Sequence, residues 1–374
     1  MFWKRRIYLD YAAGVSGNPS SPHEEGRRAK KMLEDARTSI ARLVEVQPDD
    51  VIFTSGATES NALAILGHIR ALRRVGRKDI HILYLPSAHA SIIGNANMLS
   101  AEGVNVGILP VKNYRVDIEA LKKMLTRETV LVSVEAVCGE TGVIWNTREV
   151  RHILDTAQLT FKSQILLHVD ASQAPLTEKI TRAHFAADMM TLDASKISTV
   201  RGIGVLIAHR TIPIIPLYAG GGQERGLRSG SEAPELARSF AMALAAAARA
   251  HETFRASAER NRTNLIRMIA SNVPNVQVHE GRVQAPHILN LSLPNRDTDY
   301  LVALLDEAGF AVSSRSACET DSEAGSRAVF VLTGDLERAR TTLRISWGPG
   351  ISPRAFTRFT RALVKAVAFI DSSG

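Results

Sequence analysis

Two strand-like runs each end beside a residue that could do chemistry. Residues 165–169 form a short apolar run of the length of a buried parallel strand, followed by Asp170 and then Gln173. A second run, residues 189–192, is followed by Lys196. The carboxyl ends of neighbouring strands are where open α/β sheets bind ligands. An acid there can pair with the protonated ring nitrogen of pyridoxal phosphate while a lysine bonds its aldehyde, although a surface salt bridge explains most single Asp–Lys pairs.

The composition is that of a globular enzyme without a membrane span. Of the 374 residues 45% are hydrophobic and 22% charged, and no apolar run approaches the roughly 20 residues that cross a bilayer. The first residues lack the apolar stretch of a signal peptide, so we expect a cytoplasmic protein. The net charge of +8 comes from scattered basic residues, so direct nucleic-acid binding is not expected. The two cysteines, Cys138 and Cys318, are too few for a disulfide framework and suit a reducing compartment.

Strand-like and helical patterns alternate along most of the chain. Besides the two runs above, strands are expected at residues 51–53, 80–85, 104–109, 130–134 and 202–207. This alternation predicts a doubly wound α/β domain with a mostly parallel sheet. An alanine-rich helix over about residues 231–257 then leads to a smaller α+β domain, with strands expected near residues 288–293, 310–312 and 343–346. We predict a large domain over residues 12–248 and a small one built from residues 1–11 and 249–374.

Three segments near the start carry local signals. Residues 8–13 are predicted to form a short strand that runs into a glycine-containing loop. Residues 21–24, Ser-Pro-His-Glu, read as a capping box with proline at the first helical position. Residues 54–59 turn a strand into a helix with one glycine and several hydroxyl residues, which is a possible phosphate site, although many such turns bind nothing.

Seven collinear stretches together resemble the cysteine desulfurases, which are aminotransferase-like enzymes that use pyridoxal phosphate. The resemblance runs from residue 8 to about residue 348, nearly the whole chain. The stretches are Tyr-Leu-Asp-Tyr-Ala-Ala (8–13), Gly-Asn-Pro-Ser-Ser-Pro-His (17–23), Phe-Thr-Ser-Gly-Ala-Thr-Glu-Ser-Asn (53–61), His-Val-Asp-Ala-Ser-Gln (168–173), Gly-Gly-Gly-Gln-Glu-Arg-Gly-Leu-Arg-Ser-Gly-Ser (220–231), Ser-Arg-Ser-Ala-Cys (314–318) and Leu-Arg-Ile-Ser-Trp-Gly (343–348). The resemblance implies fold type I of the pyridoxal-phosphate-dependent transferases.

The resemblance also implies which residues bind the cofactor. Lys196 would carry pyridoxal phosphate, Asp170 would pair with its ring nitrogen, and Gln173 would contact its ring hydroxyl. Ala57 and Thr58 would bind the phosphate.

Four further positions match family residues that contact the cofactor or the substrate. Ser195 stands near the phosphate, where the family has a histidine. Ser231 stands where the family uses a hydroxyl of the partner subunit for the same phosphate, which implies a homodimer. His89 matches the histidine that stacks on the ring and moves protons, although a lone histidine is more often structural. Arg344 matches the clamp for the substrate carboxylate, which a planar guanidinium can bind with two hydrogen bonds.

Cys318 matches the cysteine that accepts the sulfur atom. Free cysteines are more often small buried residues, but residues 313–325 are mostly polar and lack apolar periodicity. We therefore expect an exposed loop that lets the thiol approach the cofactor and then turn outward. The length of this loop resembles the long-loop group, which passes sulfur directly to scaffold proteins.

The phosphate site departs from the family pattern. The usual ending Ser-x-His-Lys is replaced by Asp-Ala-Ser-Lys at residues 193–196. An ionised carboxylate would repel a phosphate dianion, so we expect Asp193 to point away from the phosphate or to pair with Arg201. The resemblance therefore implies weakened retention of the cofactor.

Three other departures concern the surroundings of the site. The helix that the family places between Ala13 and Gly17 is almost absent. The family's Asn-Asn-Glu-x-Gly is Cys-Gly-Glu-Thr-Gly at residues 138–142, which loses an amide near the ring hydroxyl. Arg315 replaces a glycine in the cysteine loop.

The activity expected from the resemblance is conversion of L-cysteine to L-alanine, with the sulfur passing to Cys318 as a persulfide and then to an acceptor protein. The acceptor could serve iron–sulfur cluster assembly or tRNA thiolation. A selenocysteine lyase or another class V aminotransferase-like enzyme is the alternative of the same class. A non-catalytic homologue that acts as a partner or scaffold subunit is the alternative of another class. No metal site is expected.

Overall fold

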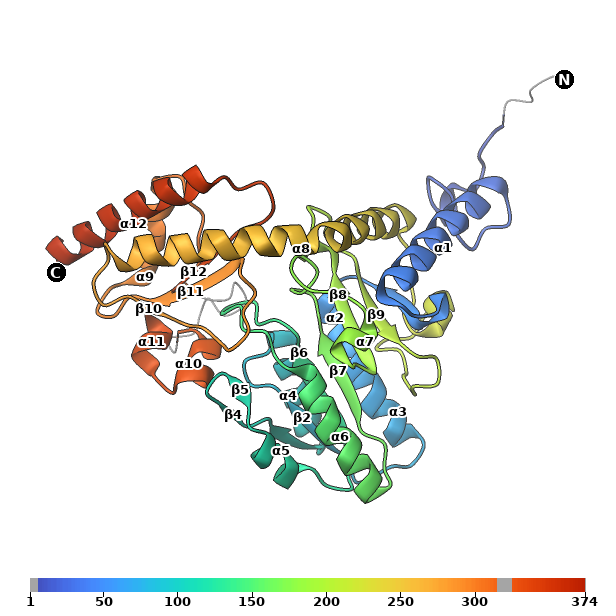
Figure 1. Ribbon diagram of the computed structural model, residues 1–374. Helices are drawn as coiled ribbons and strands as arrows, with labels where there is room; N and C mark the ends of the chain where they lie inside the picture. Colours follow the sequence, from blue (N-terminus) through green and yellow to red (C-terminus); the bar gives the residue numbers. More distant parts are fainter. Residues whose placement is uncertain (1–5, 315–324, 374) are drawn as a thin grey trace.

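The chain folds into two lobes joined by one long helix (Figure 1). The computed structural model describes residues 6–314 and 325–373. The long helix, α8 (Pro234–Ala270), buries Phe240 and Leu244 in the core of the larger lobe and Leu265 and Ile269 in the core of the smaller one. The predicted connecting helix is therefore present, although it begins at Pro234 and extends beyond the predicted end. Among the helices described, none has the length and apolar character needed to cross a membrane.

The larger lobe is built on a seven-stranded sheet with the strand order β1-β9-β8-β7-β6-β2-β3. Strands β3, β2, β6, β7 and β8 pair in parallel, whereas β9 runs antiparallel to both of its neighbours, β8 and β1. The strands are β1 (Val51–Thr54), β2 (His81–Tyr84), β3 (Asn105–Ile108), β6 (Thr129–Glu135), β7 (Leu166–Asp170), β8 (Met189–Asp193) and β9 (Gly204–Ala208). Every residue of β6 and β7 is buried, as expected for strands covered on both faces. The predicted mostly parallel α/β sheet is confirmed.

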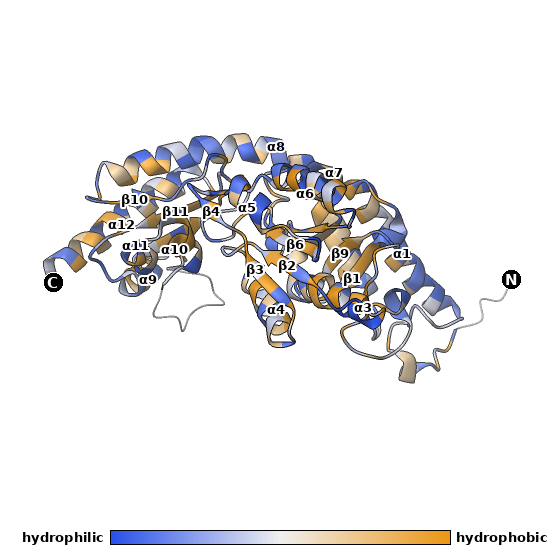
Figure 2. Ribbon diagram, turned by 90° about the horizontal axis from the view of Figure 1, so that it is seen from below, coloured by the Kyte–Doolittle hydropathy of each residue, from blue (hydrophilic) through white to orange (hydrophobic). Residues whose placement is uncertain are grey.

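Helices cover both faces of this sheet. Figure 2 shows α3 and α4 on one side of the strands and α6 and α7 on the other. Helix α2 continues through a π-helical segment, Leu63–Gly67, into α3, so one helical rod follows β1. The helices of this lobe are α1 (Glu24–Val44), α2 (Ala57–Ala62), α3 (His68–Arg74), α4 (Ala90–Ala101), α5 (Ile118–Met124), α6 (Thr147–Phe161) and α7 (Arg182–Phe185), and a short hairpin joins β4 (Val111–Lys112) to β5 (Arg115–Val116).

The smaller lobe contains a three-stranded antiparallel sheet with the order β10-β11-β12. Its strands are β10 (Gln277–Val278), β11 (Ile288–Ser292) and β12 (Thr342–Ser346), and its helices are α9 (Thr298–Glu307), α10 (Arg327–Thr333), α11 (Leu336–Arg340) and α12 (Pro353–Ser373). Leu289, Leu291 and Leu343 of the sheet pack with Leu363 of α12 in a core separate from that of the larger lobe. The predicted strand at residues 310–312 is not formed; one bridge from Ser313 to Arg344 takes its place.

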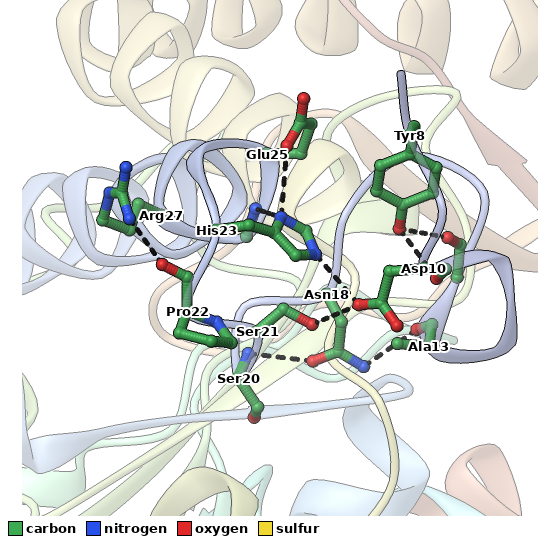
Figure 3. Close-up of polar contacts among 12 residues, drawn as sticks. Tyr8, Asp10, Ala13, Asn18, Ser20, Ser21, Pro22, His23, Glu25 and Arg27 are labelled. Carbon is green, nitrogen blue, oxygen red and sulfur yellow. Dashed lines mark hydrogen bonds and ion pairs between the residues drawn. The ribbon is translucent and has the colours of Figure 1, made fainter. Parts of the chain in front are cut away.

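The segment before α1 differs from its prediction. Residues 8–13 form no strand and include a 3₁₀ turn at Tyr11–Ala13. The Tyr8 hydroxyl donates to the carbonyls of Asp10 and Gly14, and Asp10 Oδ2 lies 2.9 Å from both Ser21 Oγ and His23 Nε2 (Figure 3). These contacts hold the described part of the segment beside the start of α1, at the opposite end of the molecule from the small lobe to which we assigned it (Figure 1).

The start of α1 also differs. The helix begins at Glu24 with His23 as its N-cap, because His23 Nδ1 accepts the amide hydrogen of Gly26. Ser21, the predicted cap, donates instead to Asp10.

Candidate active site

Three adjacent strands end in carboxylates at one edge of the large sheet. β6 ends at Glu135, β7 at Asp170 and β8 at Asp193. Glu135 and Asp170 are register partners across the β6–β7 pair. Because parallel strands bring their carboxyl ends to the same edge, the turn after β8 carries Lys196 to this edge as well.

A cavity of about 560 Å³ opens at this edge, between the two lobes. Lys196, Asp170 and Gln173 reach it from the ends of β7 and β8, whereas Arg344 reaches it from β12 of the small lobe. Seven of the predicted site residues line the cavity: Ala57, Thr58, His89, Asp170, Gln173, Lys196 and Arg344. The structure therefore brings most of the predicted site residues together around one cavity.

The Asp170 side chain is buried and held by three donors. Oδ1 accepts from the Ser172 amide at 3.0 Å and from the Ser172 hydroxyl at 2.6 Å. Oδ2 accepts from Asn61 Nδ2 at 2.7 Å. These contacts fix the orientation of the carboxylate, as expected for a group that pairs with a ligand in one geometry.

His89 is the N-cap of α4. Its Nδ1 accepts the amide hydrogen of Ser91 at 3.2 Å and lies 2.8 Å from Ser91 Oγ. Since Nδ1 is an acceptor, the neutral ring carries its hydrogen on Nε2. Ser91 Oγ in turn accepts from Asn61 Nδ2 at 2.9 Å, so hydrogen bonds connect His89 to Asp170 through Ser91 and Asn61.

Arg344 joins the small lobe to the large one. Its Nη1 donates to the carbonyl of Gly139 at 3.1 Å. Its backbone amide and carbonyl both pair with Ser313, so the chain that leads toward Cys318 is anchored to β12. Cys318 and Arg315 themselves lie outside the described residues.

A buried acidic cluster lies beside Asp170. Burial, with the charge of Asp170 as the second cause, raises the pKa of Glu135 well above its ordinary value. Burial, with Glu135 as the second cause, also raises the pKa of the Cys138 thiol, which is 1% exposed. The Cys138 sulfur is therefore held as the thiol, which is a poor nucleophile.

Asp193 does not point away from the phosphate site and makes no ion pair with Arg201, contrary to expectation. Its Oδ2 accepts the amide hydrogen of Ala57, the first residue of α2, at 2.8 Å, and its Oδ1 accepts that of Ser195 at 2.7 Å. The first turn of a helix has amide groups without partners inside the helix and a positive partial charge, so a carboxylate binds there readily. The local sequence gave no sign of this contact with α2.

Three other site residues have clear placements. Gln173 lies close to Gly139, since a Cβ added at Gly139 would lie 3.0 Å from Gln173 Nε2. Gly139 belongs to the Cys-Gly-Glu-Thr-Gly segment, in which an amide side chain of the family pattern is missing. Ser195 lies in the turn before Lys196 and does not line the cavity. Ser231 is exposed in the loop before α8 and also lies outside the cavity lining.

Comparison with known proteins identifies the family. The class-V aminotransferase family model matches residues 6–349. Cysteine desulfurase IscS 1 of Archaeoglobus fulgidus is 31% identical over 341 residues, which cover 91% of this chain and 87% of the relative. This chain belongs to the cysteine desulfurase family. A NifS/IcsS protein homolog of Lactobacillus delbrueckii subsp. bulgaricus is 37% identical, over 83% of this chain and 80% of the relative.

Solved structures agree with this assignment. A NifS-like protein superposes with a TM-score of 0.86 at 26% identity, over 94% of this chain and 92% of that chain. DndA from Streptomyces lividans superposes with a TM-score of 0.73 at 32% identity, over 91% and 93% of the two chains. The predicted fold type I is therefore confirmed.

Enzymes of the cysteine desulfurase family use pyridoxal phosphate, and the ring end of this site fits that group. Asp170 is oriented by three donors, and Gln173 and Lys196 line the same cavity. An acid, a lysine and an amide are the donor set that the ring nitrogen, the aldehyde and the ring hydroxyl require.

The phosphate end does not fit in the arrangement observed. The Ala57 amide, which would hold a phosphate oxygen in this family, already donates to the Asp193 carboxylate. A phosphate and this carboxylate would compete for one N–H group and would repel each other.

Sequence reasoning missed Asn61, Ser91 and Ser172 as site residues. Asn61 and Ser172 both fall inside stretches that identified the family, but neither spacing nor residue type indicated what they contact. The signal available in the sequence for Asn61 was an amide residue placed little more than one helical turn after Gly56.

Proposed function

We propose that this chain is a pyridoxal-phosphate-dependent cysteine desulfurase, which converts L-cysteine to L-alanine and transfers the sulfur to Cys318. The observation that supports the proposal is the meeting of Lys196, Asp170 and Arg344 at one cavity between the lobes, in a chain of this family. The NifS, IscS and other cysteine desulfurase names of its relatives agree with this reaction.

Each residue proposed to face the cofactor has a role that follows from its side-chain chemistry. Pyridoxal phosphate, when bound, withdraws electrons from the substrate Cα. Asp170 would hold the ring nitrogen in its protonated form, Gln173 would hold the ring hydroxyl, and Lys196 would take the Cα proton on Nζ. The phosphate end would be formed by Ala57 and Thr58, although the Ala57 amide donates to Asp193 in the structure; Ser195, which was also expected there, lies outside the cavity lining.

His89 and Arg344 complete the substrate side. His89 lines the cavity and its Nδ1 accepts from Ser91, so we assign the holding or delivery of a proton to Nε2. The Arg344 guanidinium binds the substrate carboxylate, and its contact with Gly139 keeps the guanidinium at the junction of the two lobes.

Cys318 accepts the sulfur. Its thiolate attacks the sulfur of the substrate, an S–S bond forms as the C–S bond breaks, and the substrate Cβ receives a proton. The products are alanine and a persulfide on Cys318, so no external oxidant or reductant is needed. An ordinary thiol has a pKa of about 8.5, so we assign formation of the thiolate to help from a cation such as Arg315 or from the imidazole of His89.

The proposal includes a cytoplasmic homodimer that hands the sulfur to an acceptor protein. Ser231 is exposed in its own chain and would contact the phosphate bound by the partner subunit. The acceptor serves iron–sulfur cluster assembly or tRNA thiolation, and the polar segment around Cys318 suits direct transfer to it. The boundary between the large and the small domain is proposed within α8, near residue 248.

The test is to incubate the purified protein with pyridoxal phosphate and L-cysteine, and to measure alanine and sulfide with and without a thiol reductant. Stoichiometric alanine and reductant-released sulfide are expected. Activity with selenocysteine alone would favour a selenocysteine lyase. A protein that binds the cofactor but forms neither product would contradict the proposal in favour of a non-catalytic homologue.

A further inference from the structure

The Asp193 carboxylate accepts two backbone amide hydrogens from different segments of the chain. One carboxylate oxygen accepts from the first amide of α2, and the other accepts from the amide of Ser195 in the turn that carries Lys196. A Cβ added at Gly56 would lie 3.2 Å from Asp193 Oδ2, so the carboxylate lies directly against the strand-to-helix turn. The carboxylate therefore joins the proposed phosphate end of the cavity to the turn that carries the lysine.

This position is the one that a phosphate would need. Asp193, Ala57 and Thr58 all line the cavity, and the helical rod that begins at Ala57 directs its amide groups toward its N-terminal end. Among the ion pairs of the described residues, none neutralises Asp193; the nearby Glu59 pairs with Arg228 instead. A phosphate that carries nearly two negative charges would therefore meet an acceptor where it needs a donor.

We propose that Asp193 determines which form of the cofactor this site prefers: its carboxylate acts as an internal substitute for the phosphate, so the site discriminates little between pyridoxal phosphate and unphosphorylated pyridoxal. The proposal rests on the proposed use of this cofactor. Phosphorylated cofactor binds only when the Asp193 side chain moves off the Ala57 amide. That movement also removes the bond to Ser195, so arrival of the phosphate loosens the turn that holds Lys196.

The first test compares two ligands on three apoproteins. Dissociation constants for pyridoxal phosphate and for pyridoxal are measured by titration of wild type, Asp193→Ser and Asp193→Asn, following the visible absorbance of the bound ligand. Removal of the carboxylate is expected to tighten pyridoxal phosphate binding about tenfold to a hundredfold and to leave pyridoxal binding within about twofold. Because both ligands carry the same aldehyde and ring, the ratio of their dissociation constants isolates the phosphate.

The matched control is Glu59→Gln. Glu59 lies in the first turn of the same helix, accepts from the Ser55 amide and from Tyr218, and does not line the cavity. The Glu59→Gln substitution also removes one negative charge from the start of this helix. The ratio of its dissociation constants for pyridoxal phosphate and pyridoxal should therefore equal that of wild type. An equal shift in Glu59→Gln would show a general charge effect and would overturn the proposal, as would an unchanged ratio in both Asp193 variants.

A second readout uses inorganic phosphate as the probe. Phosphate should raise the melting temperature of apo Asp193→Ser and Asp193→Asn but not that of the wild-type apoprotein, since only the variants lack the carboxylate that competes with phosphate for the Ala57 amide. A wild-type response as large as that of the variants would also overturn the proposal. Both readouts measure binding and neither needs turnover. Failure to form alanine would therefore contradict the proposed function, whereas only the binding and melting measurements test the role of Asp193.

Discussion

The Asn61 side-chain amide lies 2.7 Å from the carboxylate of Asp170. The same nitrogen donates to Ser91 Oγ at 2.9 Å, and Ser91 Oγ lies 2.8 Å from His89 Nδ1. The two hydrogens of one amide thus hold the acid proposed to face the ring nitrogen and, through a serine, the imidazole proposed to face the substrate. All the atoms of Asn61 are shielded from solvent, so the positions of Asp170 and His89 both depend on one buried side chain.

Asn61→Ala should destabilise the apoprotein by about 1–3 kcal/mol, because a buried carboxylate loses one of its three donors. The measurement is urea unfolding of the apoprotein. The control is Asn264→Ala, which truncates an exposed asparagine bonded to Arg267 on α8 and should change the free energy of unfolding by less than about 0.5 kcal/mol. Equal stability of the two variants would show that Asn61 does not support Asp170.

Lys196→Ala should lose the visible absorbance of the lysine-bound cofactor and all turnover, because Lys196 is the lysine in the lining of the cavity that contains Asp170. Spectra and alanine assays at saturating pyridoxal phosphate check this. Lys179→Ala is the matched variant, since Lys179 is exposed and pairs with Glu45 at the surface. Normal absorbance in the Lys196 variant would assign the cofactor to another lysine.

Cys318→Ser should still bind L-cysteine and pyridoxal phosphate but should form no persulfide, so the alanine yield falls by at least about two orders of magnitude, as expected for loss of a nucleophile. Cys138→Ser should retain most of the turnover, because the buried Cys138 has a raised pKa and is held as the thiol. Sulfide release after a reductant and alanine yield are measured for both variants. Wild-type alanine from the Cys318 variant would remove this residue from the reaction.

Glu135→Gln should stabilise the apoprotein increasingly as the pH rises above about 4.5. Burial and the charge of Asp170 raise the folded pKa of Glu135, whereas the unfolded carboxyl keeps the ordinary value of 4.5. Between these two pKa values unfolding releases a proton, so the wild-type free energy of unfolding falls as the pH rises, by up to about 1.4 kcal/mol per pH unit. Glutamine resembles the protonated acid and has no proton to release.

The difference in the free energy of unfolding between Glu135→Gln and wild type is therefore measured from about pH 5 to about pH 8. Glu119→Gln serves as the control, because Glu119 is exposed and pairs with Lys122 at the surface of α5. A difference that does not change with pH for Glu135→Gln would mean that this carboxyl is ionised in the folded protein.

The sequence by itself determined the alternation of strands and helices along most of the larger lobe and seven of the residues that line the cavity. Short apolar runs such as residues 165–169 are local signals, because a strand covered on both faces must be apolar along its whole length. The residues at the ends of such runs, Asp170 and Lys196, could then be placed at one sheet edge without a structure. The same local reasoning failed before α1, where a 3₁₀ turn at Tyr11–Ala13 takes the place of the expected strand and Asp10 contacts Ser21 and His23.

Only the tertiary structure decided the contacts between residues far apart in the chain. Asp193 and Ala57 are 136 residues apart, and Arg344 and Gly139 are 205 residues apart. Each pair forms because the sheet or the lobe junction brings two chain segments together, and no periodicity within either segment records its neighbour. The reversed strand β9, the use of Asp193 as a cap for α2 and the link from Asn61 to Asp170 all belong to this class. Unpaired amides and buried carboxylates find partners wherever the completed fold places them.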